Sequence, residues 1–258
     1  MERTKLGELT WTDLQAVDLD KQSPFYEALF GWTFEDMPTG ENTPDYRMYY
    51  KDGVVVAGGN HMSPDMKAAG MPSFWAVYIA SPDAAATAAK ALELGGKVIM
   101  PLMDVLDSGR MVAIADPEGG SIFIWQKVTF AGAGAFMDKP GTIGWADLSS
   151  RDPEAAAAFY SGVFGWDVKK LPEMEYWQLE VDGEGQGGIG PMPEMVPGES
   201  PPFWTIYFMT DDIDASVAKA VELGGSVTAP VTVVPDMLRF AVIADPAGAM
   251  FSLLQPNV

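Results

Sequence analysis

The sequence predicts an α+β protein of two tandem domains, each made of two β-α-β-β-β units. Residues 10–32 return in recognisable form as residues 144–166, and the later strand–helix segment 74–96 returns as 203–225. Strand-like and helix-like segments also follow one another in the same order in both halves. Repeats of this length indicate internal duplication, and each half of the 258-residue chain is long enough to bury a core.

The first unit opens with a strand over residues 9–16, because polar and apolar side chains alternate there. Alternation places Trp11, Asp13 and Gln15 on one face of this strand. Asp52-Gly53 is typical of a tight hairpin turn. Three shorter strands are therefore expected after the first helix, over residues 32–36, 45–51 and 54–60.

The helix between these strands ends at Gly31, a residue type that favours the left-handed conformation of a helix C-terminus. Two residues are candidates for the N-cap of this helix. Asp18 as N-cap would leave Pro24 inside the helix, at a cost of about 3 kcal/mol. Ser23 as N-cap would put Pro24 at the first helical position, where proline is tolerated.

The second unit repeats the plan after a Pro/Gly/Met-rich loop at residues 62–72. A strand over 74–80 leads to a helix over 82–94 that ends at Gly95-Gly96. Strands over 97–104, 110–115 and 121–127 complete the domain. The Gly/Ala-rich residues 128–141 are interpreted as a linker between a first domain, 1–127, and a second, 142–258.

Composition excludes several classes of function. The net charge of −20 repels phosphate backbones and anionic lipid, so neither a nucleic-acid partner nor a membrane is expected. No apolar run reaches the roughly 18 residues that a membrane helix needs. The absence of cysteine excludes disulfides and thiolate metal sites, and it fits a cytoplasmic protein. His61 is the one histidine, which excludes a site built from several imidazoles of one chain.

Three recurring motifs carry a family resemblance. These are FYxxxFGW near residues 25–32 and 159–166, LGG after the second helix, and ADPxG near residues 115–119 and 244–248. Together they resemble the vicinal oxygen chelate superfamily, which includes glyoxalase I, bleomycin-resistance proteins and extradiol dioxygenases. The resemblance covers nearly the whole chain. It implies glyoxalase/bleomycin-resistance-like domains, each a curved mixed sheet around a cleft.

The resemblance also assigns three metal-ligand positions to each domain. In this chain they hold Trp11, Ala76 and Phe123 in the first half, and Trp145, Thr205 and Ser252 in the second. Indole, methyl and phenyl groups donate no lone pair to a cation, and neutral hydroxyls are poor primary ligands. We therefore expect no metal ion and no other cofactor.

The cleft-facing strands supply the candidate functional residues. Trp11 and Trp145 are either an aromatic wall for a ligand or a plug of core side chains. Asp13 and Asp147 share those faces, where desolvation would raise the pKa of each carboxyl group and suit a general base. The alternative is that the two carboxylates form structural ion pairs with the candidate residues Arg110 and Arg239.

Further candidates follow from the alternation of the neighbouring strands. Tyr78 and Tyr207 would either hydrogen-bond a ligand or pack with Phe123 and Trp125, whereas Trp75 and Trp204 should lie on the opposite face, under the helices. His61 is interpreted as a surface residue, with a proton shuttle as the alternative.

These observations favour a protein that binds an aromatic or polycyclic small molecule without metal, for sequestration, carriage or an accessory role in specialised metabolism or antibiotic resistance. The ligand contacts would come from the candidate residues Trp11, Tyr78, Phe123, Trp125, Trp145, Thr205, Tyr207, Ser252, Arg110 and Arg239. One alternative is a metal-free isomerase, lyase or hydroxylase-like enzyme with Asp13 or Asp147 as base. Another is a metal-dependent lactoylglutathione lyase or extradiol dioxygenase. The protein is expected to be a monomer or homodimer.

Overall fold

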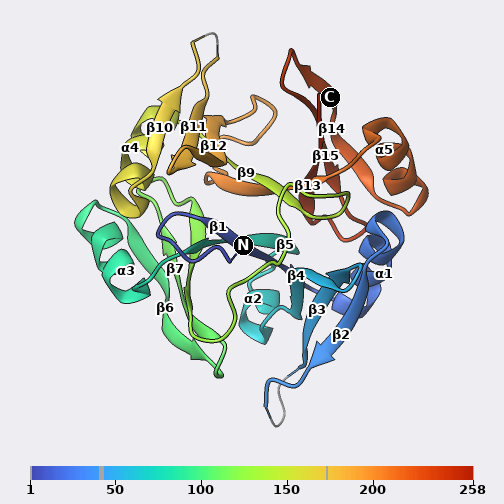
Figure 1. Cartoon of the computed structure of the whole chain (residues 1–258), viewed down its shortest axis with the longest axis horizontal. Coiled ribbons are helices and arrows are strands. Elements are labelled where there is room, and N and C mark those ends of the chain that lie inside the picture. The colour runs from blue at the N-terminus through green and yellow to red at the C-terminus, as the bar shows by residue number, and fades with distance from the viewer. Residues whose placement is uncertain (1, 41–43, 173, 258) are drawn as a thin grey trace.

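The structure, a computed structural model, describes residues 2–40, 44–172 and 174–257 and contains two eight-stranded sheets, one in each half of the chain. In Figure 1 each sheet curves into a U, and the two U shapes lie base to base and open in opposite directions. The prediction of an α+β protein with two tandem domains is confirmed.

The first domain contains two β-α-β-β-β units. Its elements are β1 (Leu9–Ala16), α1 (Leu19–Phe30), β2 (Thr33–Met37), β3 (Tyr46–Lys51), β4 (Val54–His61), α2 (Pro64–Ala68), β5 (Phe74–Ala80), α3 (Ala84–Glu93), β6 (Lys97–Val105), β7 (Gly109–Ala115) and β8 (Ser121–Lys127).

The second domain repeats this order without a counterpart of α2 in the described residues. Its elements are β9 (Ile143–Ser150), α4 (Pro153–Phe164), β10 (Asp167–Lys170), β11 (Trp177–Val181), β12 (Glu184–Pro191), β13 (Phe203–Met209), α5 (Ile213–Glu222), β14 (Ser226–Val234), β15 (Leu238–Ala244) and β16 (Met250–Pro256).

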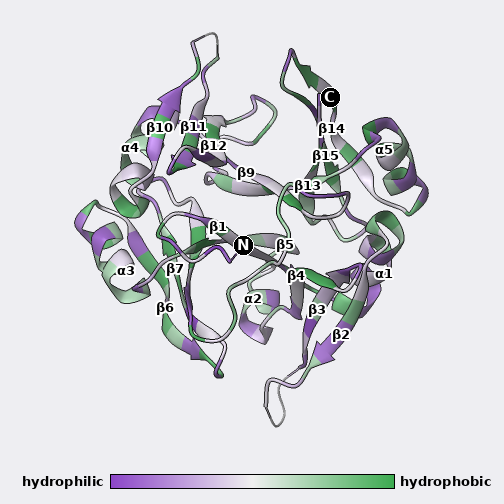
Figure 2. Ribbon diagram, in the orientation of Figure 1, coloured by the Kyte–Doolittle hydropathy of each residue, from purple (hydrophilic) through white to green (hydrophobic). Residues whose placement is uncertain are grey.

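The opening strands of the two units form the centre of each sheet. In the first sheet, whose order is β2-β3-β4-β1-β5-β8-β7-β6, strand β1 pairs antiparallel with β5 and parallel with β4. The second sheet, β10-β11-β12-β9-β13-β16-β15-β14, has the same arrangement. Among the outermost strands, β10 is hydrophilic (Figure 2), whereas β6 and β14 consist mainly of apolar residues. The centre of each sheet is therefore the part that both units share.

Helix α1 begins at the first of its two possible caps. Asp18 is the N-cap, and its side chain accepts a hydrogen bond from the backbone N–H of Lys21. Pro24 consequently lies inside the helix. The alternative cap, Ser23, is wrong because its hydroxyl is buried in hydrogen bonds with Tyr49 and Arg47.

Two connecting segments are more ordered than their composition suggests. Residues 62–72, expected to be a loop, contain the short helix α2, with Ser63 as its N-cap and Pro64 in its first turn. Residues 128–141, expected to be a linker, are fixed by backbone hydrogen bonds, among them Gly134 N to Val55 O at 2.9 Å. The first part of the linker therefore packs on the first domain, whereas Gly141 N donates to Met209 O of the second domain at 2.9 Å.

The two domains pack through the sheet faces that carry the helices. Trp75 of β5 and Phe208 of β13 lie 5.1 Å apart between ring centroids, and Phe30 of α1 lies 5.2 Å from Phe208. Trp75 thus lies on the helix side, as expected. One hydrophobic core cluster runs through both domains. Burial of these faces leaves each concave face turned away from the other domain (Figure 1).

A pair of buried carboxylates joins the domains at two related places. Asp245, after β15, accepts hydrogen bonds from Gln22 Nε2 and Tyr26 OH of α1, at 2.7 and 2.9 Å. In the related contact, Asp116 of the first domain accepts from Tyr160 OH of α4 at 3.1 Å. The ADPxG and FYxxxFGW motifs therefore meet across the domain interface, where each aspartate accepts hydrogen bonds from the other domain.

No helix in the described ranges has the length and the hydropathy to cross a bilayer.

We predict that Tyr26→Phe and Tyr160→Phe each lower the free energy of unfolding by about 1–3 kcal/mol, because each removes a hydrogen bond to a buried carboxylate. Asp116 Oδ2 loses its tyrosine donor, whereas Asp245 Oδ2 keeps Gln22 Nε2, so Tyr160→Phe should cost more. Urea denaturation should show one cooperative transition for both domains, and the losses should add in the double variant. Tyr50→Phe, at a half-buried tyrosine of β3, is the control. Two separate transitions would contradict the shared core.

Candidate functional site

The concave face of the first domain carries a buried carboxylate held by hydroxyl and amide donors. Asp13 of β1 is 2% exposed. Its Oδ2 accepts hydrogen bonds from Tyr46 OH at 3.0 Å and Tyr78 OH at 2.9 Å, and its Oδ1 accepts from Gln15 Nε2 at 2.7 Å. Trp11 Nε1 donates to Tyr46 OH at 2.9 Å. Asp13, Trp11 and two tyrosines therefore form one network.

The second domain repeats this network around Asp147 of β9. Oδ1 of Asp147 accepts from Tyr176 OH at 2.7 Å and from Trp145 Nε1 at 2.9 Å, and Oδ2 accepts from Tyr207 OH at 2.8 Å. The residue types match those of the first domain, and their strands correspond. Two copies of an Asp-Tyr-Tyr-Trp cluster, one on each concave face, are thus the shared polar feature of the two sheets.

Each cluster depends on a glycine that lets one tyrosine approach the sheet. Register places Gly188 of β12 beside Asp147, and a Cβ at Gly188 would collide with the hydroxyl of Tyr176. Gly58 of β4 stands in the same relation to Tyr46. These glycines are required by this close approach, since neither has a positive φ.

Burial sets the charge of these groups. Desolvation raises the pKa of Asp13 to about 6, although the donors Gln15, Tyr78 and Tyr46 oppose the shift. Desolvation likewise raises the pKa of Asp147. The pKa of each tyrosine in the clusters lies well above its usual value, first because of burial and then because of the neighbouring aspartate. The tyrosines therefore remain protonated donors at neutral pH.

The two predicted ion pairs of these carboxylates are wrong. Arg110 Nε lies 3.0 Å from Asp104 Oδ1, its cross-strand neighbour on β6. Arg239 Nη2 lies 2.8 Å from Asp214 of α5, so it points to the helix face of β15. Because side chains alternate along a strand, the concave face receives the residues on either side of each arginine instead.

The structure brings the six positions assigned to metal ligands onto the concave faces. Trp11, Tyr78 and Phe123 lie in register on β1, β5 and β8, and Ala76 pairs with Asp13. In the second domain, Thr205 pairs with Asp147, and Ser252 lies opposite Tyr207. Within the described ranges, no group of three or more His, Cys, Asp or Glu side chains is placed to hold a metal ion. The donor set does not fit a divalent cation.

The two concave faces differ in exposure. Trp11, Tyr78 and Trp125 are buried in the first domain, at 4%, 3% and 6% exposure. In the second domain Trp145 is half-buried, as is Phe240 of β15, 6.1 Å from the ring of Tyr207. Aromatic surface is therefore accessible on the concave face of the second domain, whereas Phe123 is the half-buried aromatic candidate of the first.

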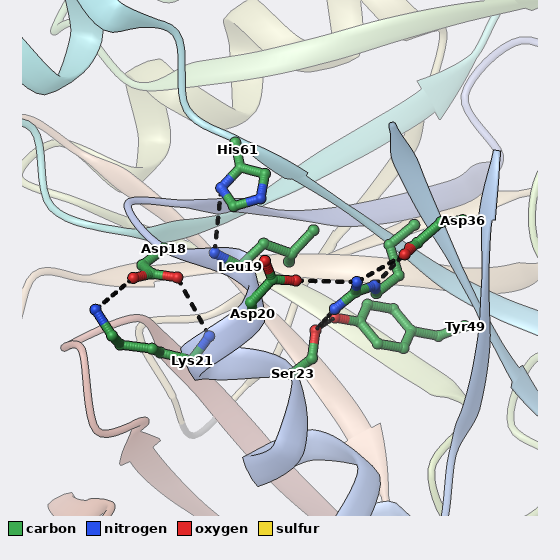
Figure 3. Close-up of polar contacts among 9 residues, drawn as sticks. Asp18, Leu19, Asp20, Lys21, Ser23, Asp36, Tyr49 and His61 are labelled. Carbon is green, nitrogen blue, oxygen red and sulfur yellow. Dashed lines mark hydrogen bonds and ion pairs between the residues drawn. The ribbon is translucent and has the colours of Figure 1, made fainter. Parts of the chain in front are cut away.

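His61, at the end of β4, lies beside the N-terminus of α1. Its Nδ1 accepts a hydrogen bond from the backbone N–H of Leu19 at 3.4 Å (Figure 3). Nearby, Arg47 forms ion pairs with Asp20 and Asp36 and donates a hydrogen bond to Ser23. The half-buried His61 thus contacts the helix terminus instead of either aspartate cluster.

Sequence reasoning missed Tyr46 and Tyr176, which complete the two clusters. A signal was present, because each tyrosine stands six residues before an Asp-Gly turn, at Asp52-Gly53 and Asp182-Gly183. The hairpin following each tyrosine returns to the centre of the sheet, beside the strand that carries the aspartate. Comparison of the two halves would therefore have paired these tyrosines.

Comparison with known proteins gives one consistent result. Residues 8–122 and 142–253 match the family described as the Glyoxalase/Bleomycin resistance protein/Dioxygenase superfamily. The chain is 37% identical over 250 residues to "Putative glyoxylase CFP32" of Mycobacterium tuberculosis, covering 97% of this chain and 95% of the relative. It is 33% identical over 270 residues to the anthracycline biosynthesis protein DnrV of Streptomyces peucetius, covering 99% and 95%.

A solved structure shares the fold at low identity. The Mn(II)-bound glyoxalase from Novosphingobium aromaticivorans superimposes with a TM-score of 0.66 at 16% identity, over 98% of this chain and 83% of that one.

We predict that the stability difference between the protein and its Asp13→Asn variant depends on pH. The folded state holds the proton of Asp13 up to about pH 6, whereas an unfolded aspartate releases it near 3.8. Ionisation of Asp13 in the folded protein therefore costs about 3 kcal/mol. The free energy of unfolding should fall by this amount as the pH rises from about 4 to about 6.5. Urea denaturation at several pH values measures this, and parallel curves for the two proteins would contradict it.

We predict that Gly188→Ala lowers the free energy of unfolding by about 1–3 kcal/mol, because the added methyl group displaces Tyr176 from Asp147. Gly190→Ala in the same strand is the matched control, since its Cβ would meet Tyr176 at an ordinary 3.5 Å. Urea denaturation compares the two variants. Equal stability of both would show that the tyrosine contact contributes nothing.

Proposed function

The chain belongs to the Glyoxalase/Bleomycin resistance protein/Dioxygenase superfamily, and on that premise we propose that it binds a flat aromatic or polycyclic small molecule without a metal ion. One observation carries the proposal. At the positions where metal-using relatives hold their ion, the concave faces present indole, phenyl, methyl and hydroxyl groups around a carboxylate.

The contacts on the concave faces suit such a ligand. Trp145, Tyr207 and Phe240 offer aromatic surface, and apolar walls with a few placed polar groups are what small-molecule sites need. The hydrogen bond from Trp145 Nε1 to Asp147 fixes the plane of the indole ring. An indole held in one orientation loses little conformational entropy when a flat ring stacks on it.

The relatives support the same class of ligand. The name of the Streptomyces peucetius relative refers to anthracycline biosynthesis, and anthracyclines contain fused aromatic rings. A sequestering, carrier or accessory role in specialised metabolism or antibiotic resistance would follow from binding alone.

A second candidate function is metal-free acid–base catalysis. Burial raises the pKa of Asp147, and the hydroxyl donors Tyr176 and Tyr207 fix the position of its carboxyl group. Such a carboxylate could accept a proton from a bound substrate. Under this alternative, Asp147→Asn would abolish turnover while leaving ligand affinity nearly unchanged.

We predict that the protein binds the anthracycline daunorubicin, used as a polycyclic probe, with equal affinity before and after treatment with a chelator. Trp145→Leu should weaken binding roughly tenfold, because the stacking surface is lost. Quenching of tryptophan fluorescence measures the affinity. Asp214→Asn, an exposed change on the helix side, is the control. Binding that disappears on chelation and returns with Mn²⁺ would contradict the proposal.

A further inference from the structure

The linker between the domains lies on the concave face of the first domain. The ring of Phe130 meets Trp11 edge-on, with the centroids 5.1 Å apart at an angle of 90°, and lies 6.3 Å from Trp125. Trp125 Nε1 donates to the backbone oxygen of Phe130 at 2.8 Å. Phe130 therefore packs on both concave-face tryptophans and satisfies the indole N–H of one of them.

Backbone contacts fix this segment at several points. The N–H groups of residues 128, 129 and 130 all donate to Ser108 O at 3.0 Å. Thr10 Oγ1 donates to Ala131 O at 2.5 Å, and the N–H of Ala133 donates to Thr10 O at 2.9 Å. Gly132 has a φ of +111°, and a side chain there would collide with Thr10. So many fixed groups indicate a permanent part of the fold.

The corresponding aromatic surface of the second domain is partly exposed. Trp145 and Phe240 are half-buried, as is Leu238 at the start of β15, and they form a separate apolar cluster with Tyr207, Met209 and Leu254. Of the equivalent first-domain residues, Trp11, Tyr78 and Trp125 belong instead to the large shared core. No described segment packs on Trp145 as Phe130 packs on Trp11.

We infer that the concave face of the second domain is the ligand site and that Phe130 of the linker occupies the equivalent site of the first. This inference rests on the proposed function and specifies the half of the molecule that performs it. The phenyl ring of Phe130 shows that this face accepts an aromatic ring, because it makes a T-shaped contact with the Trp11 indole while Tyr46 and Tyr78 donate to Asp13.

The charges define the ligand class further. Asp147 is the acidic group at the centre of the second face, and the protein carries a net charge of −20. Both disfavour an anionic ligand. The site is therefore suited to a neutral or cationic planar aromatic molecule, bound against Trp145, Leu238 and Phe240.

Two equivalent half-buried residues provide a matched test. Phe240 on β15 and Met111 on β7 occupy the same position in the two domains, and neither lies in the buried core. In calorimetric titration with daunorubicin, we expect one molecule bound per chain. Phe240→Ala should weaken binding roughly tenfold, and Met111→Ala should change it less than twofold. Circular dichroism verifies that both variants are folded.

The outcomes separate this inference from the proposed function. Two molecules per chain, or an affinity that responds to Met111→Ala and not to Phe240→Ala, would overturn the assignment to the second domain and leave the proposed function intact. No binding of the probe by the folded protein would overturn the proposed function, and the assignment with it. A single site whose affinity falls with Phe240→Ala and not with Met111→Ala supports both the assignment to the second domain and the proposed function.

Discussion

The packing of the two helix-covered sheet faces against each other is the constraint on which the rest of the molecule depends. Apolar surface on one face of each sheet must be buried, and here each domain buries it against the other. Asp116 and Asp245 fix the alignment, because each accepts a hydrogen bond from a tyrosine of the opposite domain. A buried carboxylate without these donors would be strongly unfavourable. Both concave faces are consequently directed away from the interface.

The concave faces show how a fold can retain its sheet geometry while the chemistry of its centre changes. An aspartate lies at the centre of each sheet, but the tyrosines that surround it are donors, and no cluster of cation ligands lies beside it in the described chain. Burial raises the pKa of Asp13 and favours its protonated form, although the hydroxyl and amide donors oppose this shift. The aromatic residues around each carboxylate contribute surface for packing or for a ligand.

Duplication has not made the two faces equivalent. The linker follows the last strand of the first domain, and Phe130 and its neighbours return across the concave face of that domain. The second face keeps half-buried aromatic and aliphatic side chains, which form a small cluster of their own. The linker thus covers the concave face of one domain, and partly exposed aromatic side chains remain on the other, a difference that identical repeats would not show.

The sequence alone determined the duplication, the order of strands and helices, the turns and the residue types at the centres of the sheets. These features depend on local periodicity and on residues such as Asp18 and Gly31, whose preferences act within a few positions. The tertiary structure decided which groups meet: tyrosines instead of Arg110 and Arg239 around the aspartates, Tyr26 on Asp245, and Phe130 on Trp11. Such contacts join residues far apart in the chain, and a pattern along one strand states the face of a side chain but not its partner.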